Sequence, residues 1–487
     1  MSSTYKHGVY TREQATSLVA PIAGTAGLQV IIGTAPVNLI DNPTAAVNTP
    51  LLANNYKEAV ELVGYSTDFE NYTLCEAISA NFNVVGTGPI VLINVLNPEN
   101  TAHVTDMKGG EIKINNGVAV VEETGILIEG LAVKKGETSL ARGTDYTTAF
   151  NEDGTLNIIV LGTEETEGMT VLNVTGKKLN PEAVKAEDIV GGVDTSTGAE
   201  KGLEVIRQIY PKLSMTPGIL VAPRFSADAI VSAALQAKTK EINGVFKCVT
   251  IIDIDSKGET GAKKYTDVKT RKEEQAVIDP NAYAVWPFAA VGETVYSGSS
   301  LAAALTAYTD AVNDDTPNVS PSNKTLPISK MCLADGTEVI LDQDQANTIN
   351  SFGVATFLNM NGFRLWGNNT AAYPGNTDPK DRWFSVRRFL SWAANSFILT
   401  YFQRVDSPAN KRLIEAIVDS ENVRGNGFVA RDICARYEIV FLEDENTTTD
   451  LLNGKLTFHQ YITPYTPAED IEDVIEFDPE ALSAALG

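Results

Sequence analysis

In the first third and in the middle of the chain, short apolar runs typical of strands alternate with apolar spacings typical of helices. Short β-branched runs are typical of buried strands, whereas apolar residues spaced three and four apart are typical of helices with one buried face. Strands are predicted at 28–32, 90–96, 218–222, 248–254 and 282–287, and helices at 56–63, 74–82, 227–243 and 301–312. Strands that alternate with helices in this way predict an α/β domain.

A period-two pattern separates the two α/β stretches. Asn116-Gly117 and Asp153-Gly154 supply the left-handed backbone of tight hairpin turns. The strands predicted around these turns are 112–114 with 118–120 and 146–150 with 156–161, and a further strand is predicted at 171–174. We therefore interpret 99–198 as a β-rich insertion domain on the outer surface, and 21–98 with 199–325 as one discontinuous α/β domain.

The last third of the chain predicts an α+β domain over residues 326–467. Helices with one apolar face are predicted at 383–402 and 408–418. A strand is predicted at 455–463, where the apolar residues alternate with polar ones; these apolar residues are Leu456, Phe458 and Ile462. The fold class is thus a multidomain α/β (α+β) protein.

The end of the chain, residues 468–487, does not fit into that domain. A less regular strand is predicted at 471–477, beyond Pro464 and Pro467. Proline donates no hydrogen bond to a sheet ladder, so this strand cannot be central in its own sheet. It is available to complete the sheet of a neighbouring copy, and assembly is the function that this arrangement indicates.

Composition narrows the classes of partner. The net charge is −24, from 38 Lys and Arg against 62 Asp and Glu, which argues against a nucleic-acid binder. No run of 18 apolar residues is present, so no transmembrane helix is expected. The first 19 residues lack the layout of a signal peptide, and export by the general secretory route is not expected.

Charge is distributed unevenly near the C-terminus. From Arg364 to Arg436 there are 11 basic against 7 acidic residues, a balance of +4, whereas 437–487 holds 12 acids and one Lys, a balance of −11. Complementary patches of this kind favour head-to-tail contact between copies, although a merely solvated acidic end remains the alternative. We expect four basic residues to meet carboxylates on another chain or to form a solvated face: Lys380, Arg382, Arg387 and Arg388.

No catalytic, cofactor or metal site is expected. Asp253 and Asp255 follow an apolar strand, where α/β enzymes often place metal-binding carboxylates, but no second acidic cluster accompanies them. The Gly-containing stretch 24–33 matches no phosphate-binding loop. The cysteines lie far apart and are expected to be reduced; they are Cys75, Cys248, Cys332 and Cys434. A metal-dependent α/β hydrolase centred on the two aspartates stays open as the alternative.

Several motifs resemble the tail sheath proteins of contractile phage tails and of phage-tail-like bacteriocins. Gly8-Val9-Tyr10 and the strand entry at 28–33 are similar to the opening of that family. WGNNT at 366–370 resembles the family signature WGxRT, with Asn369 where arginine is common. Further segments follow the family's order: 373–381, SVRRF at 385–389, 399–405, 408–417, GKL at 454–456, 462–465, 467–469 and 471. The match is specific over about 326–478, moderate over 8–98 and 200–312, and weak in the insertion.

The resemblance implies a structural subunit that stacks as hexameric rings around an inner tail tube and contracts. Terminal arms would add strands to a neighbour's sheet, which is a form of β-augmentation. The candidate arm residues are Tyr5, Val9 and Tyr10 at the front and Ile471, Ile475 and Phe477 at the back. The acceptor strand would contain Leu456, Phe458 and Ile462.

The same resemblance implies the other partners. Lys380, Arg382, Arg387 and Arg388 would face carboxylates of the tube, and baseplate and tail terminator proteins would bind the ends of the polymer. Assembly would occur in the host cytoplasm, and the product would be a virion tail or a tail-like particle. Another self-assembling shell, such as a surface-layer protein, is a second alternative.

Overall fold

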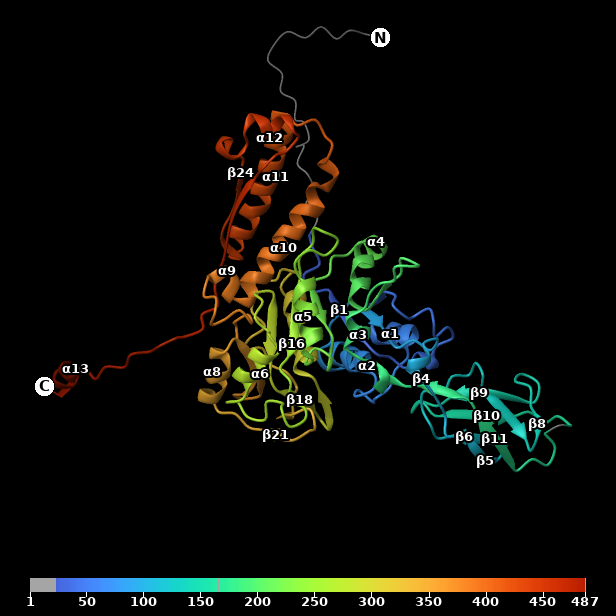
Figure 1. The fold of residues 1–487 in the computed structure, drawn as a ribbon. Helices are drawn as coiled ribbons and strands as arrows, with labels where there is room; N and C mark the ends of the chain where they lie inside the picture. The colour runs from blue at the N-terminus through green and yellow to red at the C-terminus, as the bar shows by residue number, and fades with distance from the viewer. Residues whose placement is uncertain (1–22, 165, 487) are drawn as a thin grey trace, which may run out of the picture.

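A mixed sheet of eight strands organises the body of the protein, shown in the computed structural model of Figure 1. The structure describes residues 23–164 and 166–486, so the front arm predicted at 5–10 lies outside the described residues. In spatial order the strands are β2 (Leu51–Ala53), β3 (Ile90–Asn94), β1 (Gln29–Gly33), β15 (Ile219–Val221), β16 (Val249–Asp253), β17 (Ala282–Val285), β22 (Val354–Asn359) and β23 (Phe363–Trp366). The inner six pair in parallel, and β2 and β23 run antiparallel at the two edges.

Helices cover both faces of this sheet, which explains its near-continuous apolar strands. They include α1 (Tyr56–Val63), α2 (Thr73–Ile78) with a π-helical extension η2 (Ser79–Val85), α3 (Ala186–Val190), α4 (Ile209–Leu213), α5 (Ala229–Lys238), α6 (Val268–Glu274), α7 (Gly298–Ala311) and α8 (Gln343–Ser351). Local sequence sets the helix starts: the side chains of Asn55, Asp228 and Ser297 each cap the first turn of their helix. The mixed α/β class predicted from the sequence is confirmed.

The sheet does not respect the boundary expected at residue 326. β22 pairs with β17, and Phe357 and Phe384 belong to the same buried core as β1. A division at 326 would therefore cut through a hydrogen-bonded sheet and its core, and the expected start of the C-terminal domain at 326 is corrected: residues up to Phe384 contribute to the body. A smaller sheet completes this side of the body, in the order β19 (Thr294–Tyr296), β18 (Phe288–Val291), β20 (Lys330–Cys332) and β21 (Glu338–Val339).

The β-rich segment packs around a core of its own, set off from the body in Figure 1. One sheet has the order β6 (Val118–Val121), β10 (Leu156–Val160) and β9 (Tyr146–Phe150), and another has the order β5 (Gly110–Lys113), β11 (Val171–Thr175), β7 (Ala132–Lys135) and β8 (Thr138–Ser139). The chain enters and leaves through a two-stranded neck, β4 (Val104–Asp106) with β12 (Lys177–Leu179). Gly192–Val193 (β13) and Glu200–Lys201 (β14) form a separate short hairpin.

One of the two predicted hairpins is correct. β9 and β10 pair across Asp153-Gly154 as expected. Asn116 and Gly117 do adopt positive φ angles, and Asn115 bonds Val118 across the turn. Beyond that turn the strands part, because β5 pairs with β11 and β6 pairs with β10. The predicted pairing of 112–114 with 118–120 is therefore wrong.

The C-terminal part consists of two long helices and a two-stranded sheet at the top of Figure 1. α9 (Pro379–Arg382) leads into α10 (Phe384–Tyr401), which is followed by α11 (Lys411–Ala430), β24 (Cys434–Val440), α12 (Thr448–Leu452) and β25 (His459–Pro464). β24 and β25 are antiparallel, with Tyr437 opposite Ile462. Leu456 and Phe458 precede β25, so of the three predicted acceptor residues only Ile462 lies in the strand.

The predicted strand at 471–477 is absent from the single chain. Residues 465–478 form no helix or strand and run away from the body, and the chain then forms α13 (Pro479–Leu486) (Figure 1). A strand exists only where its backbone groups pair with another strand, and within one chain this segment meets none. The correction concerns the isolated chain and leaves the pairing with a neighbour as a prediction.

Candidate assembly interface

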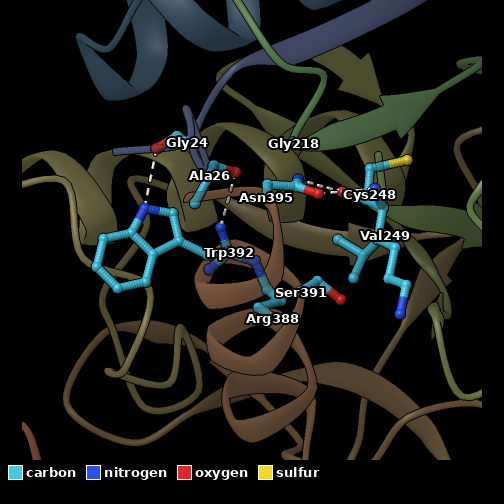
Figure 2. Close-up of a pocket in the computed structure, with 10 residues that line it drawn as sticks. Gly24, Ala26, Gly218, Cys248, Val249, Arg388, Ser391, Trp392 and Asn395 are labelled. Carbon is cyan, nitrogen blue, oxygen red and sulfur yellow. Dashed lines mark hydrogen bonds between the residues drawn. The ribbon is translucent and has the colours of Figure 1, made fainter. Parts of the chain in front are cut away.

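The N-terminal segment enters the fold against α10. Trp392 Nε1 donates to the carbonyl of Gly24 at 2.9 Å, and the amide of Gly24 donates to Ser396 Oγ at 2.8 Å. Arg388 Nη2 donates to the carbonyl of Ala26 at 3.2 Å, as Figure 2 shows. These bonds fix residues 24–26 on α10, the helix that also packs against β24 and β25.

The cavity beside these contacts is too small for a ligand larger than a water molecule. The cavity drawn in Figure 2 has a volume of about 10 Å³ and is lined by Gly24, Arg388, Ser391 and Trp392 among others. This volume is about that of one water molecule. Asn395 closes the cavity on the other side, since its side chain exchanges two hydrogen bonds with the backbone of Lys247 at 2.7 and 2.9 Å.

Arg388 is buried, which contradicts its predicted contact with a tube. Its side chain is 2% exposed, and its Nη1 donates to Asp310 Oδ1 at 2.9 Å while Nη2 bonds the second carboxylate oxygen. Burial raises the pKa of Asp310, and the neighbouring guanidinium opposes that shift. The pair joins α10 to α7, so Arg388 connects parts of one subunit and is withdrawn from the set of tube contacts.

The other three predicted basic residues also have acidic partners in their own chain. Lys380 Nζ lies 2.8 Å from carboxylate oxygens of both Asp378 and Asp381. Arg387 Nη1 lies 3.3 Å from Asp381 Oδ1. Arg382 binds Glu469 of the C-terminal segment at 2.8 Å. Among these residues Lys380 is the most exposed, with about half of its side chain open to solvent.

Position 369 shows why the asparagine of WGNNT fits this chain. Asn369 is 5% exposed, and its Oδ1 accepts a hydrogen bond from Arg382 Nε at 2.9 Å. An arginine at this position could not take that role, because a guanidinium has no acceptor.

The two-stranded sheet rests on a buried apolar cluster. Ile462 of β25 packs against a group made of Phe389, Trp392, Ala393, Phe428, Ile433, Cys434 and Tyr437. Phe458 contacts the rings of Phe441 and Phe397, with centroid distances of 5.5 and 6.5 Å. The half-buried residues of β25 are therefore held by α10 and α11.

A buried carboxylate that was not predicted from the sequence connects the helices and strands of this unit. Glu421 of α11 is 1% exposed and accepts hydrogen bonds from Tyr437 at 2.7 Å and Tyr401 at 3.0 Å. Gln460 of β25 donates to the same carboxylate at 3.3 Å. Burial, followed by the charge of Glu421, raises the pKa of both tyrosines, which keeps them protonated as donors. Glu421 lies beyond the predicted end of the helix at 418, and its tyrosine and glutamine partners come from other elements, so only the fold reveals its role.

The C-terminal segment exposes apolar side chains next to acidic ones. Ile471 is 86% exposed and Ile475 87%, and Val474 and Phe477 are similarly open. Side chains of this size are rarely left in water together unless a partner covers them. The β24–β25 sheet consists of two strands in the part of the chain that the structure describes. Helix α11 covers the outer edge of β24, where the side chain of Asn422 bonds both the amide and the carbonyl of Ile439. Within the described residues, the outer edge of β25 has no strand paired to it.

The aspartates of the alternative enzyme hypothesis are engaged within the fold. Asp253 is 1% exposed and accepts hydrogen bonds from Ser226 Oγ at 3.0 Å and from Ser299 N at 2.8 Å. Burial raises its pKa to about 6, against the lowering effect of these bonds. Asp255 pairs with Arg271 at 2.8 Å. Over residues 23–164 and 166–486, no three His, Cys, Asp or Glu side chains gather as metal ligands would.

Within the same residues, no helix combines the length and apolar character needed to cross a bilayer.

Solved structures with a similar fold are sheath proteins of contractile particles. The sheath of an extracellular contractile injection system, PVC, in the contracted state matches with a TM-score of 0.57 at 13% identity, over 99% of this chain and 100% of that one. The helical sheath of the anti-feeding prophage in the contracted state matches with a TM-score of 0.55 at 14% identity, over 98% and 100% of the two chains. At this identity the likeness establishes the fold, which is that of contractile sheath proteins.

Sequence relatives carry the same description. The chain is 25% identical over 501 residues to the tail sheath protein of Burkholderia phage BcepMu, with 100% of both chains covered. It is 25% identical over 309 residues to a putative prophage major tail sheath protein of Pseudomonas aeruginosa, which covers 63% of this chain and 76% of the relative. No protein-family model matches. The resemblance to tail sheath proteins is confirmed.

Proposed function

We propose that this chain is the structural subunit of a contractile tail sheath that polymerises through its terminal segments. The observation that carries the proposal is the exposed apolar segment 471–477, which leaves a subunit whose β24–β25 sheet has an unpaired outer edge at β25 within the described residues. Each hydrogen bond of an added strand would contribute about 1 kcal/mol net. Alternate side chains would also be covered by the neighbour.

The placement of residues 24–26 and of Glu469 supports this proposal. Residues 24–26 are fixed on α10, and α10 packs on the cluster that supports β25. In this proposal the C-terminal arm extends from Glu469 to another copy and adds a strand at the outer edge of its β25.

The remaining parts of the proposal concern the particle. Stacked hexameric rings would surround an inner tube, and contraction would release energy stored at assembly, as in other strained switches. The proposed tube contact keeps Lys380, with Arg382 and Arg387 beside it, and loses Arg388. Baseplate and tail terminator proteins would bind the ends of the sheath, and assembly would take place in the host cytoplasm.

Electron microscopy of the purified full chain tests this function. The proposal expects long hollow cylinders whose wall repeats the subunit helically. Compact monomers whose activity requires a divalent metal would favour the hydrolase, and flat two-dimensional arrays would favour a surface-layer protein.

A further inference from the structure

Three side chains close to Arg382 in the sequence and one from the C-terminal segment converge on its guanidinium group. Its guanidinium lies over the ring of Trp383 at 4.0 Å and over the ring of Tyr373 at 4.6 Å, measured to the ring centroids. Its Nε donates to Asn369 Oδ1 at 2.9 Å, and its Nη2 donates to Glu469 Oε2 at 2.8 Å. Stacking on two rings and bonding on two edges leave this planar group little freedom to turn.

The support behind Arg382 is rigid. The amide of Thr370 donates to the carbonyl of Arg382 at 2.7 Å, and Asn369 pairs with Trp383 in a short antiparallel bridge. Asn369 Nδ2 in turn donates to the carbonyl of Asn350 at 3.3 Å, which directs its oxygen toward Arg382. The Nη2 group is therefore held at a defined place on the surface of the body.

Glu469 is the point at which the C-terminal segment is fixed to that place. Among the described residues 465–486, its ion pair with Arg382 is the one polar side-chain contact with the rest of the chain. Residues 470–478 beyond it are exposed and form no helix or strand. The direction of the whole segment is consequently set at this single pair.

We propose that Arg382 is a positioning residue: it fixes the direction in which the C-terminal arm leaves the subunit, so that the arm reaches the β24–β25 sheet of a second copy. This inference rests on the proposed function, because it supposes that the arm binds a neighbour. An arm held near its bound direction loses less conformational freedom on binding than a free one.

Two variants test the inference in the full chain, Arg382→Gln and Glu469→Gln. Each should raise the protein concentration at which half of the chain polymerises by about three- to tenfold, the range expected for a partly exposed charged hydrogen bond. Arg382→Lys keeps the charge but loses the planar stacking, and should fall between wild type and Arg382→Gln. Arg207→Gln is the matched control, since Arg207 pairs with Glu200 on the surface of the body and should polymerise as wild type does.

A distance measurement separates positioning from general weakening. Spin labels at Lys324→Cys and Glu472→Cys report on the body and the arm, and the four native cysteines are buried. The distribution of distances between the two labels should be narrow in the wild-type background. It should be broad with Glu469→Gln, which alters only the arm side of the Arg382–Glu469 ion pair.

Unchanged polymerisation and unchanged distances in both variants would overturn the inference. If the unmodified chain forms no polymer, the proposed function fails, and the distance distribution alone decides the role of Arg382. If Arg382→Gln lowers the melting temperature, its effect on polymerisation could come from a destabilised body. The polymerisation of Glu469→Gln, which alters only the arm, then decides.

Discussion

Arg388 on α10 and Asp310 on α7 form an ion pair in which neither side chain is more than 2% exposed. Both charges are removed from water, so each depends on the other for compensation. The pair lies where α10 leaves the α/β body for the C-terminal helices. It therefore couples the body to the unit that carries the proposed acceptor sheet.

Breaking this pair should destabilise the protein strongly. Arg388→Met leaves the carboxylate of Asp310 buried without a partner, and we expect a loss of about 3–5 kcal/mol in the free energy of unfolding, measured in urea. The double variant Arg388→Met/Asp310→Leu should recover most of that loss, because no uncompensated charge remains. Equal losses in the single and the double variant would contradict this account of the pair.

The pH dependence of stability should reveal Asp253. Its folded pKa is raised to about 6, so the folded state binds the proton more tightly than the unfolded chain, where an aspartate titrates near about 3.9. The resulting stability is fully present below about pH 4 and is lost as pH rises through about 6. The free energy of unfolding of wild type relative to Asp253→Asn should fall by up to about 3 kcal/mol between pH 4 and pH 7. A difference that does not vary with pH would show that Asp253 titrates normally.

The insertion should be dispensable for polymerisation. Asp106 and Lys177 are paired residues in the neck, so replacing 107–176 by Asn-Gly closes β4 and β12 as a hairpin without moving the body. We expect a folded protein that still forms cylinders of reduced outer diameter in electron micrographs. Loss of all assembly in this variant would place the insertion within the lattice.

Deleting residues 468–487 should separate folding from assembly. The removed segment is exposed and lies outside the buried core, so the melting temperature should change little. Polymerisation should be lost, because the strand offered to the neighbour is missing. Sedimentation at high protein concentration measures the outcome, and cylinders like those of the full chain would rule out the C-terminal arm.

Elements whose signal is local could be predicted from the sequence. The apolar spacing of 383–402 predicted α10 to within a residue at each end, and Asp153-Gly154 predicted the β9–β10 hairpin. Both depend on neighbouring residues alone. Helix α11 was predicted to end near 418 but continues to Ala430. It contains Gly425 at the point where β24 approaches closely: a Cβ there would lie 2.3 Å from the carbonyl oxygen of Tyr437.

Features that depend on distant partners could not be predicted in this way. The carboxylate that neutralises Arg388 belongs to Asp310, which lies 78 residues away in the sequence. Arg388 was therefore predicted to be exposed. β24 was missed because an irregularity between Cys434 and Arg436 breaks the two-residue alternation of its buried positions. The pattern at 471–477 indicates a strand, but its partner would belong to another subunit.

The most direct test is a cryo-electron microscopy map of the assembled full chain that resolves side chains. The account predicts that residues 471–477 of one subunit lie as a strand along an outer edge of the β24–β25 sheet of another. A map in which both chain ends fold back onto their own subunit would contradict it.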